Sequence, residues 1–235
     1  MFRLFFTPGW FNGYDLLFST VGLVVALLIA AYSWRIYRFN KENRFMYFSL
    51  AFLLVSVSLA FKIFTSGVLY YYPVRETVYQ VIGSAAGPRL KYSALFYRAG
   101  FFFQMASMLG AWLLIFLVSQ KSRARLTKFY EVSQIGLFAY LLLLVSVISN
   151  FDYKVFYLTS SVLLSLIVLN YYKNYLTTTK KNNALKVMAA FMLILAGNLM
   201  SIFVFLQNGS YVVGEALTLV GFLILLQTYR QVVRR

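Results

Sequence analysis

Long apolar blocks, each about as long as a bilayer is thick, dominate this 235-residue sequence. A helix needs about 20 mostly apolar residues to cross the hydrocarbon core of a membrane. Seven stretches meet this requirement, at residues 14–34, 45–64, 95–118, 130–148, 153–172, 185–206 and 212–229. Only 12% of the residues are charged, whereas a soluble domain has about 25%. The sequence therefore predicts an all-α, integral membrane bundle of seven transmembrane helices that forms a single domain over residues 1–235.

The basic residues are distributed unevenly between the two sides of this bundle. With seven spans, 15 of the 22 Lys and Arg residues lie in the loops of one side or at the C-terminal end. Positively charged loops stay in the cytoplasm, so we expect a multi-pass protein of the plasma membrane with its N-terminus outside and its C-terminus in the cytoplasm. The 67–94 connection is then extracytoplasmic, and the aromatic residues of 1–13 lie at headgroup level. The same rule explains the net charge of +16, so we expect a lipid bilayer and no nucleic acid as partner.

The residue types that most often carry chemistry are missing or scattered. Cysteine and histidine are both absent, which excludes disulfides, thiolate nucleophiles, thiolate or imidazole metal sites and an imidazole base. The six carboxylates are spread along the chain, at Asp15, Glu42, Glu76, Glu131, Asp152 and Glu215. No acidic pair that would hold Mg²⁺ is visible. We therefore expect no catalytic residue, no metal and no cofactor, which argues against an enzyme.

Small residues recur at helical spacing along several spans. They form stripes at Ser19, Gly22, Ala26, Ala30 and Ser33, at Gly100, Gln104, Ser107 and Ala111, at Ala190, Ile194, Gly197 and Ser201, and at Gly214, Thr218 and Gly221. Small residues let two helix backbones approach closely, so we expect these stripes to face neighbouring helices. The opposite face of the 95–118 span carries large residues from Phe101 to Trp112, which we expect to face lipid or to fill gaps.

Most acids have a simple structural interpretation. Asp15, Glu131, Asp152 and Glu215 each fall within about the first turn of a predicted span. A carboxylate there interacts with free N–H groups and with the positive end of the helix dipole, which stabilises the helix by about 0.3–1 kcal/mol. Helix capping is therefore the first interpretation of these residues.

A functional interpretation concerns the outer half of the bundle. Lys62 shares a helix face with Ser58 and Ala51, the kind of small face that points into a bundle. Ionisable groups inside a membrane usually face the interior or a water-filled cavity and pair with one another. The sharpest hypothesis is therefore a Lys62–Glu215 pair that lines an outward-open pocket formed by spans two, three, six and seven.

Three further residues complete the candidate ligand-binding set. Asn198 and Gln104 lie within apolar spans, where we expect interhelical hydrogen bonds. Arg98 projects on the large-residue face of its span, so we expect its side chain to reach toward the headgroups. All three lie near the level of Lys62 and Glu215.

The final span, YVVGEALTLVGFLILLQTYRQVVRR, resembles the closing helix of small seven-helix membrane proteins of archaea and other prokaryotes. Some of those proteins are uncharacterised, and others are the membrane sensor modules of histidine kinases. The resemblance rests on Glu215, Gly221, an aliphatic run, and Tyr229 with Arg230. It implies a seven-helix sensor fold. No output domain follows Arg235, so we expect such a sensor to pass its signal to a separate signalling protein.

The sequence thus predicts a receptor- or sensor-like membrane protein with an outward-facing polar pocket and no output domain of its own. Two alternatives from other classes remain open. One is a small transporter or channel, which a flux assay in vesicles would detect. The other is a structural or accessory subunit of a membrane complex, which would be extracted together with unlike chains.

Overall fold

The computed structural model describes residues 8–11, 13–70, 76–77, 92–120, 136, 140, 153–177, 181–207 and 209–233. Its helices are α1 (Tyr14–Asn40), α2 (Asn43–Tyr70), α4 (Tyr92–Ser119), α6 (Tyr153–Thr177), α7 (Lys181–Ile202) and α8 (Gly209–Val233), with 3₁₀ turns η1 (Gly9–Phe11) and η2 (Phe203–Phe205). Every regular element in these ranges is helical. Six of the helices are long and apolar enough to cross a membrane, as expected of an all-α, multi-pass membrane protein.

Two predicted segments fall mainly outside the described residues. The predicted span at 130–148 is described only at Gly136 and Tyr140, which both have helical backbone. The predicted extracytoplasmic loop at 67–94 is described at its two ends and at 76–77. Its ends are not loop, because α2 continues to Tyr70 and α4 begins at Tyr92.

The first predicted connection, over residues 35–44, is much shorter than expected. Helix α1 runs to Asn40 and α2 begins at Asn43, so only Lys41 and Glu42 join them. The backbone N–H of Lys41, whose φ is 55°, donates to the carbonyl of Tyr37 at 2.8 Å and ends α1. Arg and Lys are good helix formers although they do not belong in hydrocarbon. An apolar block in the sequence therefore marks the part of a helix that lies in lipid, and it underestimates the full length of the helix.

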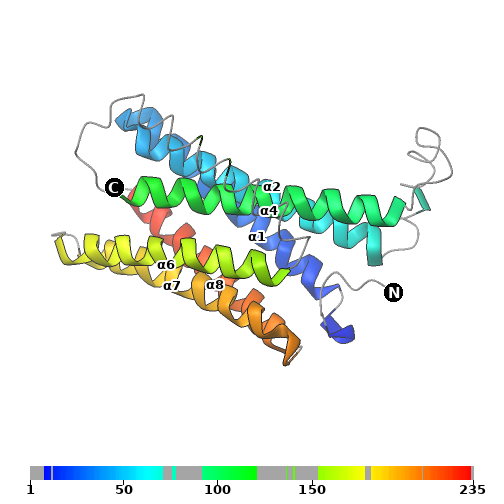
Figure 1. Cartoon of the computed structure of the whole chain (residues 1–235). Coiled ribbons are helices and arrows are strands. Elements are labelled where there is room, and N and C mark those ends of the chain that lie inside the picture. The colour runs from blue at the N-terminus through cyan, green and yellow to red at the C-terminus, as the bar shows by residue number, and fades with distance from the viewer. Residues whose placement is uncertain are drawn as a thin grey trace.

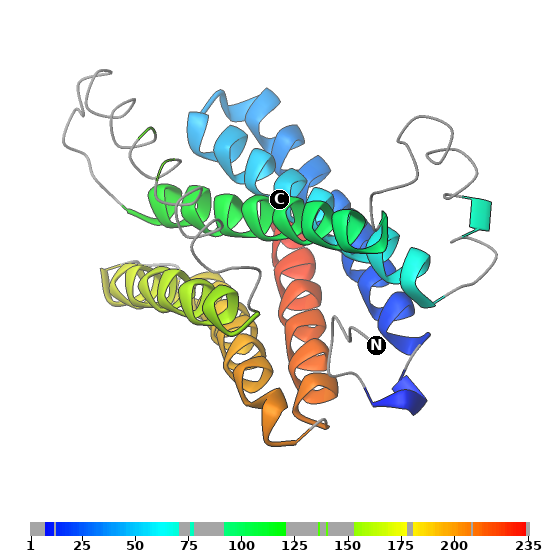
Figure 2. The same ribbon diagram turned by 45° about the vertical axis from the view of Figure 1, so that its right-hand side comes forward.

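The six long helices form a closed ring. Neighbours pack in the order α1, α2, α4, α6, α7, α8, and α8 returns to α1. Figures 1 and 2 show the same arrangement from two directions, with α8 between the α1–α2 pair and the α6–α7 pair. The first and last long helices are therefore neighbours in the ring, with the start of α8 beside the start of α1.

The small stripes predicted on α7 and α8 face each other. A Cβ atom on Gly197 would lie 2.6 Å from the carbonyl oxygen of Gly214, and one on Gly214 would lie 2.7 Å from that of Gly197. A Cβ on Gly221 would lie 2.8 Å from the carbonyl oxygen of Ala190. Real Cβ atoms do not approach other atoms so closely, so only glycine fits at these positions. The prediction of close helix contact is confirmed.

The stripe on α1 is also confirmed, since it packs against α2. Ala26 and Ala30 are buried in the core. Ser33 Oγ donates to the carbonyl of Phe45 at 2.9 Å, and Ser49 Oγ donates to that of Ala30 at 2.9 Å. These serines join the two helices near their shared turn.

Helix α4 is buried on more than its small face. Four large side chains of the opposite face are each at most 1% exposed: Phe101, Met105, Leu109 and Trp112. The large-residue face was expected either to face lipid or to fill gaps, and these four side chains fill gaps inside the bundle. Phe103, which the sequence places beside the small face, is 48% exposed. The reason is that α4 packs against α2 on one side and α6 on the other.

The interior of the ring has two different halves. The aromatic half, defined here by Phe48, Phe52, Trp112, Phe222 and Tyr229, lies where α2 begins and α8 ends. Its rings pack directly: the centroids of Phe48 and Tyr229 are 4.8 Å apart, and those of Phe52 and Phe222 are 6.2 Å apart. The polar half lies at the opposite end, where α1 and α8 begin.

Candidate functional site

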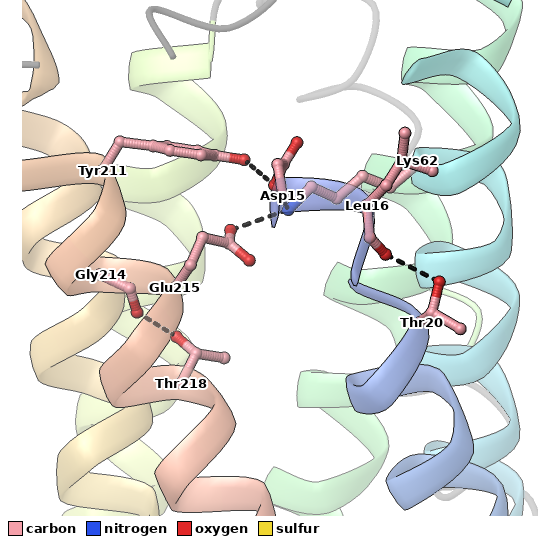
Figure 3. Close-up of polar contacts among 8 residues, drawn as sticks. All are labelled: Asp15, Leu16, Thr20, Lys62, Tyr211, Gly214, Glu215 and Thr218. Atoms are coloured by element: carbon pink, nitrogen blue, oxygen red, sulfur yellow. Dashed lines mark hydrogen bonds and ion pairs between the residues drawn. The ribbon is translucent and has the colours of Figure 1, made fainter. Parts of the chain in front are cut away.

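Three charged side chains from distant parts of the chain meet in the polar half. Lys62 Nζ lies 2.9 Å from Glu215 Oε1 and 3.2 Å from Asp15 Oδ1. The hydroxyl of Tyr211 donates to Asp15 Oδ1 at 2.8 Å. Figure 3 shows these residues on α1, α2 and α8, pointing toward one another. We call the four residues the ion network. It contains the Lys62–Glu215 pair that the sequence predicts.

The ion network is buried. Asp15 is 2% exposed, Tyr211 2% and Lys62 5%. The side chain of Glu215 is 19% exposed. Buried charges are costly unless they are paired and hydrogen-bonded, so these four side chains depend on one another for their position. Lys62 Nζ also lies 5.5 Å from the centroid of the Tyr211 ring, at a distance suited to a cation–π contact.

The capping interpretation is only partly right for Asp15 and is wrong for Glu215. Asp15 lies in the first turn of α1, near the positive end of the helix dipole, as predicted. The N-cap residue is Gly13, with no side-chain cap, and the Asp15 carboxylate accepts from Lys62 and Tyr211. Glu215 lies in the second turn of α8, whose first turn contains no acid, and it pairs with Lys62. The other two acids of that prediction, at positions 131 and 152, lie outside the described residues.

A cavity of about 60 Å³ lies beside the ion network, and all six long helices line it. Each helix contributes a polar side chain: Ser19 from α1, Ser58 from α2, Gln104 from α4, Tyr157 from α6, Asn198 from α7 and Glu215 from α8. The pocket expected between spans two, three, six and seven is thus lined by spans one and five as well. Its volume suits a few water molecules or one small ion, because pockets for drug-sized ligands measure about 300–1,000 Å³.

Four side chains around the cavity donate hydrogen bonds to backbone carbonyls. Ser201 and Thr218 donate to the carbonyl four residues earlier, at 3.0 and 2.9 Å, and Figure 3 shows the Thr218 bond. Asn198 donates to Ile194 in the same way, at 3.2 Å. Ser58 Oγ donates to a carbonyl of α4 at 2.8 Å. A hydroxyl that donates to a carbonyl can offer only lone pairs to other groups, so these hydroxyls can act toward the cavity only as acceptors.

Two oxygen atoms at the cavity have no hydrogen-bond partner within the described protein. They are Ser19 Oγ and Gln104 Oε1, on residues that are 3% and 7% exposed. A buried polar atom without a partner costs about 1–3 kcal/mol. Both atoms belong to residues that line the cavity, so a molecule or ion there is the available partner.

The structure brings together four of the five predicted site residues. Lys62, Glu215, Gln104 and Asn198 all line the cavity. The side chain of Arg98 lies outside the described part of α4, and its predicted role stays a prediction. The hydrogen bond that the structure gives the Asn198 side chain lies within α7, where its amide donates to Ile194. The side-chain oxygen of Gln104 accepts no hydrogen bond from the described residues, so its predicted interhelical bond is not seen there.

Sequence reasoning missed Asp15 and Tyr211 as members of the site. A signal for each was present, because Tyr211 lies one turn before Glu215, and Asp15 lies one turn before Ser19 on the small stripe of α1. The turn η1 also differs from the predicted headgroup anchor. Trp10 is 67% exposed as expected, but Phe11 is 3% exposed and its ring lies 6.2 Å from that of Tyr211.

The site must be interpreted from its own geometry. The resemblance of the last span to prokaryotic sensor modules stays a prediction. Neither protein-family models, nor curated protein sequences, nor solved structures give a match to this chain.

Proposed function

We propose that the protein is a receptor- or sensor-like membrane bundle whose ligand site is the cavity beside the ion network. The observation that carries this proposal is that the network joins α8 to α1 and α2 at the wall of that cavity. A ligand that alters the network changes how α8 packs on α1 and α2. The far end of α8, near Arg230, then transmits the change to a separate signalling protein or membrane complex.

The distribution of charge supports an orientation with the N-terminus outside and the C-terminus in the cytoplasm of the plasma membrane. Arg35, Arg38, Lys41 and Arg44 lie around the turn between α1 and α2, and Arg230 lies in the last turn of α8. These residues share the end of the ring that is opposite to the ion network. By the positive-inside rule this end faces the cytoplasm, so the cavity lies toward the outer side.

The direction of α4 and α6 supports a seventh span. Ser119 at the end of α4 accepts hydrogen bonds from Asn170 and Asn174 near the end of α6, at 2.9 and 3.3 Å. At the other end, the ring of Phe101 lies 4.3 Å from that of Tyr153, the first residue of α6. The two helices are therefore parallel, and two parallel spans that follow each other in a chain need a further crossing between them. The apolar block at 130–148 has the length for this crossing.

The aromatic half favours a one-sided pocket over a conduit. Phe52, Trp112 and Leu225 are 0% exposed and Phe222 is 2% exposed, so the interior between the cavity and the basic end is packed with apolar side chains. The six described spans are also continuous α-helices, whereas many transporter sites form where spanning helices are broken. A ligand that enters the cavity from the outer side therefore has no open path through the packed side chains to the basic end.

A small transporter or channel is the second candidate, because charged side chains within spans often mark ion pathways. Reconstitution into proteoliposomes separates the two. A sensor moves no ion across the membrane, whereas a transporter shows flux that depends on Lys62 and Glu215. Copurification of an unlike chain after gentle extraction would favour the accessory-subunit alternative.

The natural absence of cysteine makes the proposed coupling measurable. Spin labels at Tyr47→Cys on α2 and Gln231→Cys on α8 would report the distance between the basic ends of these helices by pulsed electron paramagnetic resonance. Both positions are exposed. We expect Glu215→Gln to shift this distance by about 1–2 Å or more, a typical displacement of signalling helices. Glu42→Gln, an exposed acid in the turn after α1, is the matched control.

An unchanged distance distribution in the Glu215→Gln variant, with the fold retained, would contradict the proposal. In that case the network would hold the outer end of α8 without influencing its cytoplasmic end.

A further inference from the structure

The ion network contains one more negative charge than positive charge. Asp15 and Glu215 each carry a carboxylate, and among the side chains that the structure describes Lys62 is the one cation paired with them. In the low-dielectric interior of a bundle, a net charge is costly unless a counter-charge is close. One further positive charge beside these three side chains would therefore neutralise the network.

The oxygen atoms around the cavity present lone pairs, which favour a cation over an anion. Ser58, Ser201 and Thr218 donate their protons to backbone carbonyls, so their oxygens present lone pairs. Ser19 Oγ and Gln104 Oε1 are two more buried oxygens, and neither has a partner in the described protein. Oxygen atoms of carboxylates, hydroxyls and amides are the usual ligands of hard metal ions.

We propose that the cavity binds one monovalent metal cation, with sodium as the ion to test first, between Glu215 and the free oxygens of Ser19 and Gln104. The volume of about 60 Å³ accommodates such an ion with a few waters and excludes a larger organic cation. A single charge matches the excess of the network, whereas a divalent ion would reverse it. This inference names the ligand of the receptor site proposed above, so it relies on that cavity being a binding site.

The first test measures the thermal unfolding of the purified full chain in detergent, in sodium, lithium, potassium or choline chloride at constant ionic strength. An ion that binds only the folded protein raises the melting temperature as its concentration exceeds the dissociation constant. At about ten times that constant we expect a rise of roughly 3–6 °C in sodium relative to choline. Equilibrium binding of radioactive sodium should give about one ion per chain.

A pair of serine variants tests the location of the ion. Ser19→Ala removes an unpartnered hydroxyl at the cavity, and Ser66→Ala removes an equally buried, unpartnered hydroxyl on α2 that does not line it. Neither change breaks a hydrogen bond within the described protein, so both variants should fold in choline chloride. We expect Ser19→Ala to weaken sodium binding about tenfold, equivalent to one ligand bond, and Ser66→Ala to leave it unchanged.

Equal unfolding temperatures in sodium and choline, without bound radioactive sodium, would overturn the inference. So would equal sodium affinity in Ser19→Ala and Ser66→Ala, or proton uptake without any preference among the salts. These results leave the receptor proposal standing if native mass spectrometry finds another small molecule that Ser19→Ala loses. Conversely, sodium binding together with sodium flux in proteoliposomes would support the cation site and reject the receptor.

Discussion

The polar and aromatic halves of the ring are built from the same six helices but stabilised in different ways. In the aromatic half, rings such as Phe48, Phe52 and Phe222 pack without directional partners. In the polar half, Asp15, Lys62 and Glu215 each need a specific partner from another helix. A volume-conserving change is tolerated in the first environment, whereas loss of one charge in the second leaves the others unpaired. The specific and fragile half is the one that contains the cavity.

The largest expected effect comes from breaking the ion network at its centre. Lys62→Met leaves two buried carboxylates without their cation, so we expect a loss of roughly 3–5 kcal/mol in the free energy of unfolding. Unfolding in mixed micelles of dodecyl sulfate and dodecyl maltoside measures it. The triple variant Asp15→Asn, Lys62→Met, Glu215→Gln should recover most of the loss, because it removes all the buried charges together.

An intermediate effect is expected from removing one hydrogen bond of the network. Tyr211→Phe deletes the donor to Asp15 but retains the buried ring, so we expect a loss of roughly 1.5–3 kcal/mol, as for a bond to a charged group. Tyr172→Phe, at a half-exposed site on α6, is the control. Equal stability of wild type and Tyr211→Phe would mean that this bond adds nothing to the polar half.

The glycine contact between α7 and α8 tests a feature that does not depend on charge. Gly214→Ala forces the two backbones apart, since its Cβ would lie 2.7 Å from a carbonyl oxygen of α7, and we expect a loss of about 1–3 kcal/mol. Gly110→Ala is the matched change, because its Cβ would lie at an ordinary distance of 3.6 Å from Leu54. Similar stabilities of the two variants would contradict the close contact.

The smallest effect is expected in the aromatic half. Phe222→Leu retains an apolar side chain of similar size among neighbours that can adjust, so we expect a loss below about 1.5 kcal/mol. A loss as large as that of Lys62→Met would remove the proposed difference between the halves.

The sequence predicts the parts of this fold that depend on local periodicity. The small stripes on α1, α7 and α8 face other helices because helical spacing alone places such residues on one side. The inward position of Lys62 follows from the same spacing. The helix ends were predicted less well, since the basic turns of α1 and α2 extend beyond the hydrocarbon blocks.

The complete site could not be predicted, because it depends on which helices are neighbours. Asp15 and Tyr211 meet only because α8 returns to α1, and they are 196 positions apart in the sequence. In the sequence, an acid near a helix start that caps the helix cannot be distinguished from one that pairs with a residue of another helix. The faces of α4 were uncertain for the same reason, since only its contacts with α2 and α6 bury both.

The most direct test of this account is a double-mutant cycle between Lys62 and Glu215, with Lys62→Met, Glu215→Gln and the double variant compared in free energy of unfolding. Side chains whose charged atoms are 2.9 Å apart in a buried site should be strongly coupled. We predict a coupling free energy of about 1.5 kcal/mol or more. Additive losses, within about 0.5 kcal/mol, would show that the two residues do not interact and would contradict the ion network.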